Sequence, residues 1–376
     1  MTHREEIWNK AQKALFEKYG ETPDIQIGSR FECEKRVLAD YGCAEYFAEL
    51  AGICKESIEK YNEKLVVKNT VCSCFTAYLL GASEINPLPP HYYCPSCERV
   101  EWIHEDDCVF DMRGTRRCEC GATMRADGYN LPYETYIPYA QRLKTKDPVP
   151  ENYSDLYSDL FEALTKKHFQ WSLFGPAQAC HLLGEATGVA SDEIDFNDRE
   201  VKYRLLLGGD FSCMHPKLAE FLKQAYAVVQ PCCYSYAEFL KLIGLAKGTG
   251  TWKHNSEELL NGKCRLADIP ATRDEVFMMI RDAMQEQGVY DTGFAYDIAN
   301  KTRKGFYAEN GMDGYTIDTL KSLGFEDWFA NYLLGVRYMS TKALSILELR
   351  YIIMLTYFKC FHPKEYEEVL AGKDVW

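Results

Sequence analysis

Two close pairs of cysteines are the residues of this sequence best suited to chemistry. The first pair is Cys94-Pro-Ser-Cys97, and the second is Cys118-Glu-Cys120, which is followed by Gly121. Two such pairs about twenty residues apart are typical of a zinc ribbon, in which each pair sits on a tight turn and the metal closes the hairpin between them. The second pair is one residue shorter than Cys-x-x-Cys, and Gly121 supplies the backbone freedom that so tight a turn needs. The sequence therefore predicts a metal site with four thiolate ligands.

Alternative ligands and an alternative role are open for these cysteines. Cys108 could replace Cys118 or Cys120 as the fourth ligand, and His104 is a weaker substitute. The simplest alternative is that several of these cysteines are buried thiols without a metal. A closed site with four cysteines has no open position for water, so we expect a structural and not a catalytic metal. Four thiolates in a ribbon favour zinc over iron.

Length and composition place the chain among globular proteins with two or three packed units. It has 376 residues, of which 47% are hydrophobic. No run of eighteen apolar residues exists, and the N-terminus is polar, so we expect neither a membrane span nor a signal peptide. The 16 cysteines are scattered through a large chain, which indicates reduced thiols and a cytoplasmic protein.

The charge is unevenly distributed along the chain. The net charge of −13 argues against a broadly basic surface for nucleic acid but leaves room for a local basic channel. Residues 236–376 contain 17 Lys and Arg against 20 Asp and Glu, and the rest contains 26 against 36. Most of the acidity therefore lies outside the C-terminal region.

Hydrophobic periodicity predicts helices at both ends of the chain and a segment without helical periodicity between them. Residues 1–20 and 30–64 have the pattern of amphipathic helices, and residues 65–75 suit a strand followed by the start of a short helix. Residues 86–134 are punctuated by Pro, Cys and Gly around the cysteine pairs, and residues 144–152 form a charged linker. Further helices are predicted at 155–168, 176–187, 215–229, 234–246, 272–287, 291–304, 315–323, 325–339 and 341–359.

Several segments resemble PolC, the DNA polymerase III alpha subunit of the family C DNA polymerases. The run Asn86-Pro-Leu-Pro-Pro-His-Tyr, which leads into Cys94, resembles the junction between the palm and the zinc segment of that family. Other matches follow in collinear order along most of the chain: Lys18 to Pro23, Arg30 to Gly42, Tyr236 to Trp252, Asn261 to Asp274, Ala295 to Gly305, Tyr338 to Ala343 and Tyr357 to Pro363. The sequence is thus similar to a truncated and degenerate PolC.

This resemblance implies an α+β fold. We expect a reduced family C palm with a zinc-ribbon insertion, followed by a mainly α-helical fingers domain. The implied domains are an N-terminal helix (1–24), a first palm-like part (25–85), the zinc ribbon (86–132), a second palm-like part (133–175) and the helical fingers-like domain (176–376). The PHP-like, exonuclease, clamp-binding and OB portions of the family have no counterpart in the sequence.

The resemblance also implies where catalysis would occur. In the family, three palm aspartates hold two magnesium ions that stabilise the attacking and leaving oxygens. Glu151, Tyr153 and Ser172 occupy the matching positions here, and only Leu156 to Gln170 separates the two elements that carry them. A phenol and a hydroxyl do not replace carboxylates on a hard divalent ion. We therefore expect nucleotidyl transfer to be lost.

The resemblance points to changes in the nucleotide-binding parts as well. The family's Gly-Ser-Arg-Gly-Ser loop binds the incoming triphosphate, and Val67 to Cys74 replaces it here. Loss of the glycines removes the close approach of the backbone to phosphate. In the fingers, the family's lysine is kept as Lys342, whereas the nearby histidine is replaced by Leu344.

A set of basic residues in the C-terminal half provides weaker candidates for contacts to DNA or nucleotide. The alternative is that they are ordinary basic residues at helix ends, favoured by the helix dipole. The set consists of Lys247, Lys253, Lys301, Arg303, Lys304 and Lys342.

Three functions fit these observations. The leading hypothesis is a PolC-like protein without nucleotidyl transfer, which binds primer-template DNA or replication proteins as a decoy or regulator and carries a structural zinc. The second is a residual polymerase that uses magnesium, Glu151 and a relocated carboxylate such as Asp155 or Asp159. The simpler explanation of Asp155, Asp159 and Glu162 is that they form the solvent-exposed face of one helix. The third is a protein-interaction module, favoured by the acidic balance.

Overall fold

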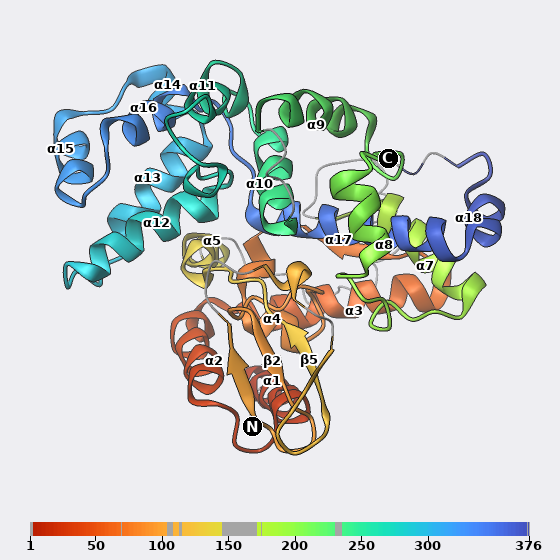
Figure 1. The fold of residues 1–376 in the computed structure, drawn as a ribbon. Coiled ribbons are helices and arrows are strands. Elements are labelled where there is room, and N and C mark those ends of the chain that lie inside the picture. The colour runs from red at the N-terminus through yellow and green to blue at the C-terminus, as the bar shows by residue number, and fades with distance from the viewer. Residues whose placement is uncertain are drawn as a thin grey trace. The chain divides into compact units, whose positions relative to one another are not determined.

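The computed structural model describes residues 3–68, 70–103, 108–112, 115–144, 171–173, 175–229, 235–373 and 375 (Figure 1). The chain divides into two compact units. Unit 1 comprises residues 1–197 and 354–376, and unit 2 comprises residues 198–353. The fold is mixed α+β and mostly helical. Within the described ranges, no helix is both long and apolar enough to cross a lipid bilayer.

Helices make up most of the described part of unit 1. A two-stranded antiparallel sheet pairs β1 with β6, and Leu65 lies opposite Leu173. The expected strand and short helix over residues 65–75 are confirmed by β1 and α4. The elements outside the ribbon are α1 (His3–Tyr19), α2 (Ile25–Leu38), η1 (Ala39–Tyr41), α3 (Cys43–Tyr61), β1 (Leu65–Val67), η2 (Thr70–Ser73), α4 (Phe75–Leu79), η4 (Tyr133–Tyr136), α5 (Ile137–Lys144), β6 (Trp171–Leu173), α7 (Gly175–Thr187) and α18 (Pro363–Leu370).

The single helix expected over residues 30–64 is wrong, because the chain breaks into α2 and α3. Helix α2 begins after Asp24, whose side chain accepts a hydrogen bond from the amide of Gln26, and it ends at Leu38. Gly42 adopts φ 70°, a left-handed conformation that glycine reaches at little cost and that cannot continue a helix. Helix α3 then runs to Tyr61 and ends at Asn62, which has φ 54°.

A buried carboxylate joins α2 to α4. The side chain of Glu34 has no exposed surface, and its two oxygens accept hydrogen bonds from the amides of Phe75 and Thr76 at 2.7 and 2.9 Å. Arg30, one turn earlier, donates to Glu34 Oε1 at 2.8 Å and to the Leu131 carbonyl at 3.0 Å. Burial lowers the pKa of Arg30, but the charge of Glu34, the hydrogen bond to it and the charge of Glu134 together outweigh burial and raise the pKa. The pair therefore fixes three distant chain segments of unit 1.

The second sheet of unit 1 is a four-stranded antiparallel ribbon with the strand order β3-β2-β5-β4 (Figure 1). Its strands are β2 (His91–Tyr93), β3 (Val100–Trp102), β4 (Thr115–Arg117) and β5 (Thr123–Asp127). His91 lies opposite Trp102 on one side and Asp127 on the other. The ribbon thus consists of two hairpins that meet along β2 and β5.

Unit 2 is helical in its described part. The expected helices at 272–287 and 291–304 are confirmed as α12 and α13, whereas that at 325–339 ends early, at Gly335 in α16. The elements are α8 (Arg199–Lys202), η5 (Tyr203–Leu207), α9 (Pro216–Val229), α10 (Tyr236–Lys247), η6 (Trp252–Ser256), α11 (Glu257–Leu260), η7 (Leu266–Asp268), α12 (Arg273–Glu286), α13 (Gly293–Arg303), α14 (Phe306–Asn310), α15 (Gly314–Ser322), α16 (Asp327–Gly335) and α17 (Lys342–Phe361). Helix α17 belongs to unit 2 up to Ile353 and to unit 1 from Met354.

Candidate metal centre

The first cysteine pair lies on the turn between β2 and β3. The Cys94 amide donates to the Arg99 carbonyl at 2.9 Å, and the Glu98 amide donates to the Cys94 carbonyl at 2.9 Å. Glu98 has φ 60°, a left-handed conformation that is uncommon outside glycine. This turn brings Cys97 back beside Cys94.

The second pair lies on the equivalent turn between β4 and β5. The Cys118 amide donates to the Ala122 carbonyl at 2.8 Å, and the Gly121 amide donates to the Cys118 carbonyl at 2.9 Å. Gly121 has φ 87°, so it meets the conformational need expected from the sequence. The shorter Cys-x-Cys spacing is therefore compatible with a turn of this kind.

Pairing of β2 with β5 brings the two turns together. Cys94 Sγ lies 3.5 Å from Cys120 Sγ, and Cys97 Sγ lies 3.6 Å from Cys118 Sγ. All four sulfur atoms lie within 4.8 Å of one another. Four sulfurs about 2.3 Å from a tetrahedral metal would be about 3.8 Å apart, so this group could hold a metal ion.

The backbone favours the thiolate form of one ligand. Burial raises the pKa of the Cys94 thiol, but hydrogen bonds from the backbone amides of Cys97 and Ser96 and from neighbouring thiols together outweigh burial and lower the pKa to about 6. Metals bind cysteine as the thiolate. In the same turn the Arg99 amide lowers the pKa of Cys97, but hydrogen bonds with Cys94 and Cys118 outweigh it and raise the pKa to about 12, so the thiolate is favoured at Cys94 and not at Cys97.

The core beneath the cysteines is small. Partly buried Ile103, Val109, Ala122 and Ala126 pack against a cluster of five buried residues. So small a core provides little stability alone, and in ribbons of this size a metal commonly supplies the rest. The cluster consists of Tyr92, Cys94, Met112, Cys118 and Met124.

The alternative ligands have different positions. Cys108 is the residue before the short helix η3 (Val109–Asp111) and is not a member of the four-sulfur group. His104 lies outside the described residues. Among the residues that the structure describes, the predicted set of Cys94, Cys97, Cys118 and Cys120 is brought together by the fold.

A buried polar network anchors the ribbon to α1 and α4, and the sequence alone did not predict it. The Asn86 amide nitrogen donates to the hydroxyl of Tyr19 and to Asp127 Oδ2, both at 2.7 Å. The Tyr78 hydroxyl donates to the same Asp127 oxygen at 3.1 Å, and His91 Nε2 lies 3.3 Å from the Tyr19 hydroxyl. Burial raises the pKa of Tyr19 well above its usual value, so its hydroxyl remains protonated. The sequence contained one indication of this network, namely the polar residues Asn86 and His91 within a proline-rich apolar run.

The predicted palm positions are only partly visible. Glu151 and Tyr153 lie outside the described residues, as do Asp155, Asp159 and Glu162. Ser172 is the middle residue of β6 and lies opposite Val66 of β1.

The segment that the resemblance matches to the family's triphosphate loop is buried. Thr70 to Ser73 form the short helix η2, and the side chains from Thr70 to Cys74 are at most 4% exposed. The thiol of Cys72 donates to the Val67 carbonyl at 3.0 Å. These side chains pack inside unit 1 and leave no glycine-lined backbone in residues 70–74.

The basic residues of unit 2 that were predicted to contact DNA or nucleotide differ in their exposure and in their partners. The ammonium group of Lys247 pairs with the buried carboxylate of Glu348. The Lys342 amide donates to Asp274 Oδ2 at 2.7 Å, within a buried ion pair between Arg273 and Asp274. Lys247 thus contributes to the fold through its side chain, and Lys342 contributes through its backbone amide.

The other four lie near the surface. Lys253 and Lys304 are exposed, whereas Lys301 and Arg303 are partly buried at the end of α13. Lys301 Nζ pairs with Asp297 at 2.6 Å. Lys253 and Lys304 are therefore the more available candidates for an external anion.

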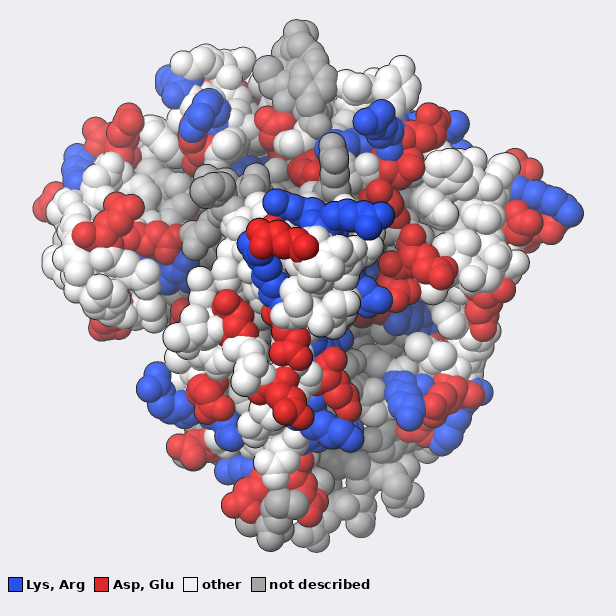
Figure 2. Space-filling view, turned by 60° about the horizontal axis from the view of Figure 1, so that its bottom comes forward, with Lys and Arg blue, Asp and Glu red and all other residues white. Residues whose placement is uncertain are grey.

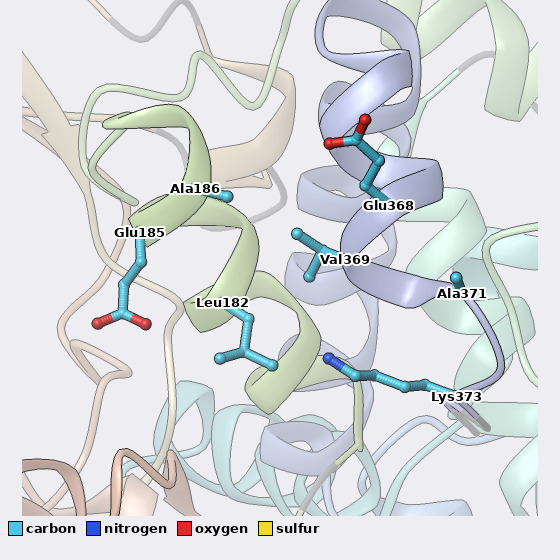
Figure 3. A pocket seen from close by; sticks show the side chains of 7 residues that line it. All are labelled: Leu182, Glu185, Ala186, Glu368, Val369, Ala371 and Lys373. Atoms are coloured by element: carbon cyan, nitrogen blue, oxygen red, sulfur yellow. The ribbon is translucent and has the colours of Figure 1, made fainter.

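A shallow groove of about 480 Å³ lies between α7 and α18 in unit 1 (Figure 3). Leu182 and Val369 face each other across it, and the carboxylates of Glu185 and Glu368 point away from each other. This arrangement does not assemble a catalytic pair of acids. The complete lining is Leu182, Glu185, Ala186, Glu368, Val369, Ala371 and Lys373.

Comparison with known proteins gives one consistent result. No family model matches the chain. It is similar to the protein "DNA polymerase III PolC-type" of Streptococcus thermophilus and of Thermotoga maritima, with 22% identity over 96% of this chain in both cases. The protein of the same name from Staphylococcus aureus is 22% identical over 93% of the chain. The resemblance to PolC is thereby confirmed at low identity.

The coverage of these relatives is partial. The chain spans about a third of their length, namely 32% of the Streptococcus protein and 34% of the Thermotoga protein. The Streptococcus alignment extends over 484 positions although this chain has 376 residues, so more than a hundred positions of that protein have no counterpart here. A large internal deletion is consistent with this alignment.

Proposed function

Because the chain is a distant relative of PolC-type DNA polymerase III, we propose that it binds DNA without carrying out nucleotidyl transfer. Such a protein would compete for primer-template DNA or for replication proteins, and so act as a decoy or regulator of replication. Its place of action would be the cytoplasm, where bacterial DNA is replicated.

The observation that carries this proposal is the loss of carboxylates at the expected metal positions. Tyr153 and Ser172 stand where the resemblance implies aspartates, and only Glu151 keeps an acidic group. Two magnesium ions close together need several carboxylate oxygens to hold them. The buried segment from Thr70 to Cys74 gives independent support, because side chains fill the place implied for a triphosphate-binding loop.

We assign a structural zinc to the four-cysteine group. Its thiols come from two turns that the strands already position, and thiolates favour zinc over the hard cations of a polymerase site. A bound zinc would hold the two hairpins together. The ligands Cys94, Cys97, Cys118 and Cys120 leave no position for a substrate, so the metal would stabilise and not catalyse.

The charge distribution favours unit 2 as the part that contacts nucleic acid. Residues 198–353 contain 19 Lys and Arg against 20 Asp and Glu, whereas the remaining residues contain 24 against 36. Figure 2 turns the bottom of Figure 1 forward, where elements of unit 1 lie, and on this face basic side chains stand singly or in small groups among acidic ones. Binding through a small local site is therefore more consistent with the surface than binding through a broad basic face.

Primer extension with the full chain tests the proposal. The protein, with its zinc content measured, is incubated with primer-template, nucleotides and either magnesium or manganese, beside an active PolC-type polymerase. We expect no incorporation, and we expect a labelled primer-template to bind with an affinity that falls as salt rises.

Two outcomes would contradict the proposal. Template-directed incorporation that disappears in Glu151→Ala, with Glu200→Ala as an exposed control, would show that a minimal catalytic site survives. Absence of nucleic-acid binding at low salt, together with salt-insensitive binding to replication proteins after nuclease treatment, would instead identify a protein-interaction module.

A further inference from the structure

Unit 2 presents two exposed aromatic rings beside two exposed cations. Phe306 and Tyr338 are each 44% exposed, and Lys304 and Arg337 are exposed as well. We call these four residues the aromatic–basic surface. Single exposed apolar side chains are common, so the spatial grouping of these residues decides whether they form a site.

The backbone brings the two halves of this surface together. The Met339 amide donates to the Arg303 carbonyl at 3.2 Å. Gly305 has φ 71°, and a Cβ built on it would lie 2.4 Å from the Arg337 carbonyl oxygen. Consecutive Cα atoms are about 3.8 Å apart, so the Cα atoms of Phe306 and Tyr338 lie within roughly 10 Å of each other. Two stacked bases of a single strand can span such a separation.

The segment that carries Tyr338 is held in place. The Thr249 carbonyl accepts hydrogen bonds from the amides of Arg337 and Tyr338 at 2.8 and 3.0 Å, and the Thr249 amide donates to the Tyr338 carbonyl at 2.8 Å. These bonds fix the backbone of the segment before any ligand arrives. Less conformational entropy is then lost on binding.

Cations outnumber acids in the two segments that carry the rings. Residues 299–310 and 335–344 together contain five Lys and Arg and one acidic residue, Glu309. Asp297 and Asp313, outside these segments, lie near Lys301. The ammonium group of Lys301 lies 5.6 Å from the centre of the Phe306 ring and also pairs with Asp297. A phosphate backbone that followed this surface would meet cations beside each ring.

We propose that the aromatic–basic surface binds single-stranded nucleic acid, with bases stacked on Phe306 and Tyr338 and phosphates beside Lys304 and Arg337. This inference rests on the proposed function and adds a site and a ligand class to it. Aromatic rings with neighbouring cations bind single strands largely independently of sequence, since every base has a stacking face. A duplex hides those faces, and the nearly neutral charge of unit 2 provides little to hold its two phosphate backbones.

Fluorescence anisotropy with the full chain and a labelled 12-nucleotide oligothymidine tests this site, with a hairpin duplex as the second probe. Phe306→Leu and Tyr338→Leu should each weaken oligothymidine binding about 5- to 140-fold, because each removes one stacking partner. The double variant Lys304→Gln, Arg337→Gln should lower the slope of log affinity against log salt by about 1.4, for two lost phosphate contacts.

Matched controls come from the same unit. Tyr290 is 76% exposed and Lys263 is exposed, so Tyr290→Leu and Lys263→Gln make the same chemical changes elsewhere on unit 2. Both should leave binding unchanged, and circular dichroism should show that all variants remain folded.

The outcomes separate the two proposals. If the wild-type chain binds oligothymidine and Phe306→Leu and Tyr338→Leu bind it equally well, the site is refuted while DNA binding stands. If the wild-type chain binds only the duplex, single-strand recognition is refuted. If it binds neither probe, the proposed function itself fails. A parallel oligouridine titration distinguishes DNA from RNA as the strand that is bound.

Discussion

Replacing Glu34 by Gln should destabilise unit 1 strongly, although the two side chains have nearly the same shape. Glu34 has no exposed surface and accepts four hydrogen bonds, from the Arg30 guanidinium, the amides of Phe75 and Thr76, and the Thr76 hydroxyl. Glutamine keeps one acceptor oxygen but turns an NH₂ group toward a donor. It also leaves the Arg30 charge without its counterion.

The magnitude follows from this burial. Removing one partner of a buried ion pair costs about 3–5 kcal/mol. Arg30 is 16% exposed and keeps its hydrogen bonds to the Ser73 and Leu131 carbonyls, so we expect the lower end of this range. At about 1.4 kcal/mol per tenfold, a cost of about 3 kcal/mol makes local opening of the region around α2 and α4 about 140-fold more frequent.

Hydrogen exchange followed by mass spectrometry measures this opening for peptides of α2 and α4. Glu200→Gln is the matched control, since Glu200 Oε1 and Arg204 Nε are also 2.8 Å apart at spacing i,i+4 but are 50% and 41% exposed. That variant should cost less than about 1 kcal/mol. Equal protection of α2 and α4 in Glu34→Gln and wild type would refute the assignment of Glu34 as a buried, charged clamp.

Three further predictions concern the metal centre and unit 2. Cys97→Ser should lower the zinc content, measured by mass spectrometry, well below one ion per chain and increase exchange in the ribbon; retention of one tightly held zinc would exclude this ligand set. Burial raises the pKa of Asp274, but Arg273 and Lys342 together outweigh burial and lower the pKa below the unfolded value of about 3.9. The stabilisation should be present above that value and lost as pH falls through the folded pKa, so acid unfolding of Asp274→Asn should depend less on pH there. Gly305→Ala should destabilise unit 2 by more than the roughly 1–2 kcal/mol that a left-handed alanine costs, because the added Cβ would meet the Arg337 carbonyl. The control Gly288→Ala has φ 79° and no atom within 4 Å of the added Cβ, so its cost should not exceed that range. Equal urea midpoints for the two variants would contradict the contact at Gly305.

The four-cysteine group could be predicted from the sequence because its determinants are local. Each cysteine pair and its turn occupy only a few neighbouring residues, and the glycine after Cys120 signals the left-handed conformation of the second turn. To bring the two pairs together, the surrounding residues had only to form two hairpins. The same locality explains why most helices of unit 2 were predicted, since their periodicity is a property of a single segment.

The polar clamps could not be predicted, because they join residues that are far apart in sequence. Glu34 meets amides 41 and 42 residues later, and Arg30 reaches a carbonyl 101 residues away. A glutamate on an amphipathic helix is ordinarily a surface residue, and nothing nearby in the sequence marks this one as buried. The end of α2 before Gly42 was missed for a different reason. The sequence contains the glycine, but the apolar pattern of a helix continues on both sides of it.

Unit 1 is built from two chain segments that are separated in the sequence by unit 2, and this has a consequence for synthesis on the ribosome. Residues 354–376 belong to unit 1, yet they are translated only after the whole of unit 2. At about 5–20 residues per second, the 198–353 segment delays them by roughly 8–30 s. During that interval unit 2 can fold while the N-terminal part of unit 1 still lacks its final segment, so nascent chains stalled before residue 354 should be unusually sensitive to proteases and dependent on chaperones.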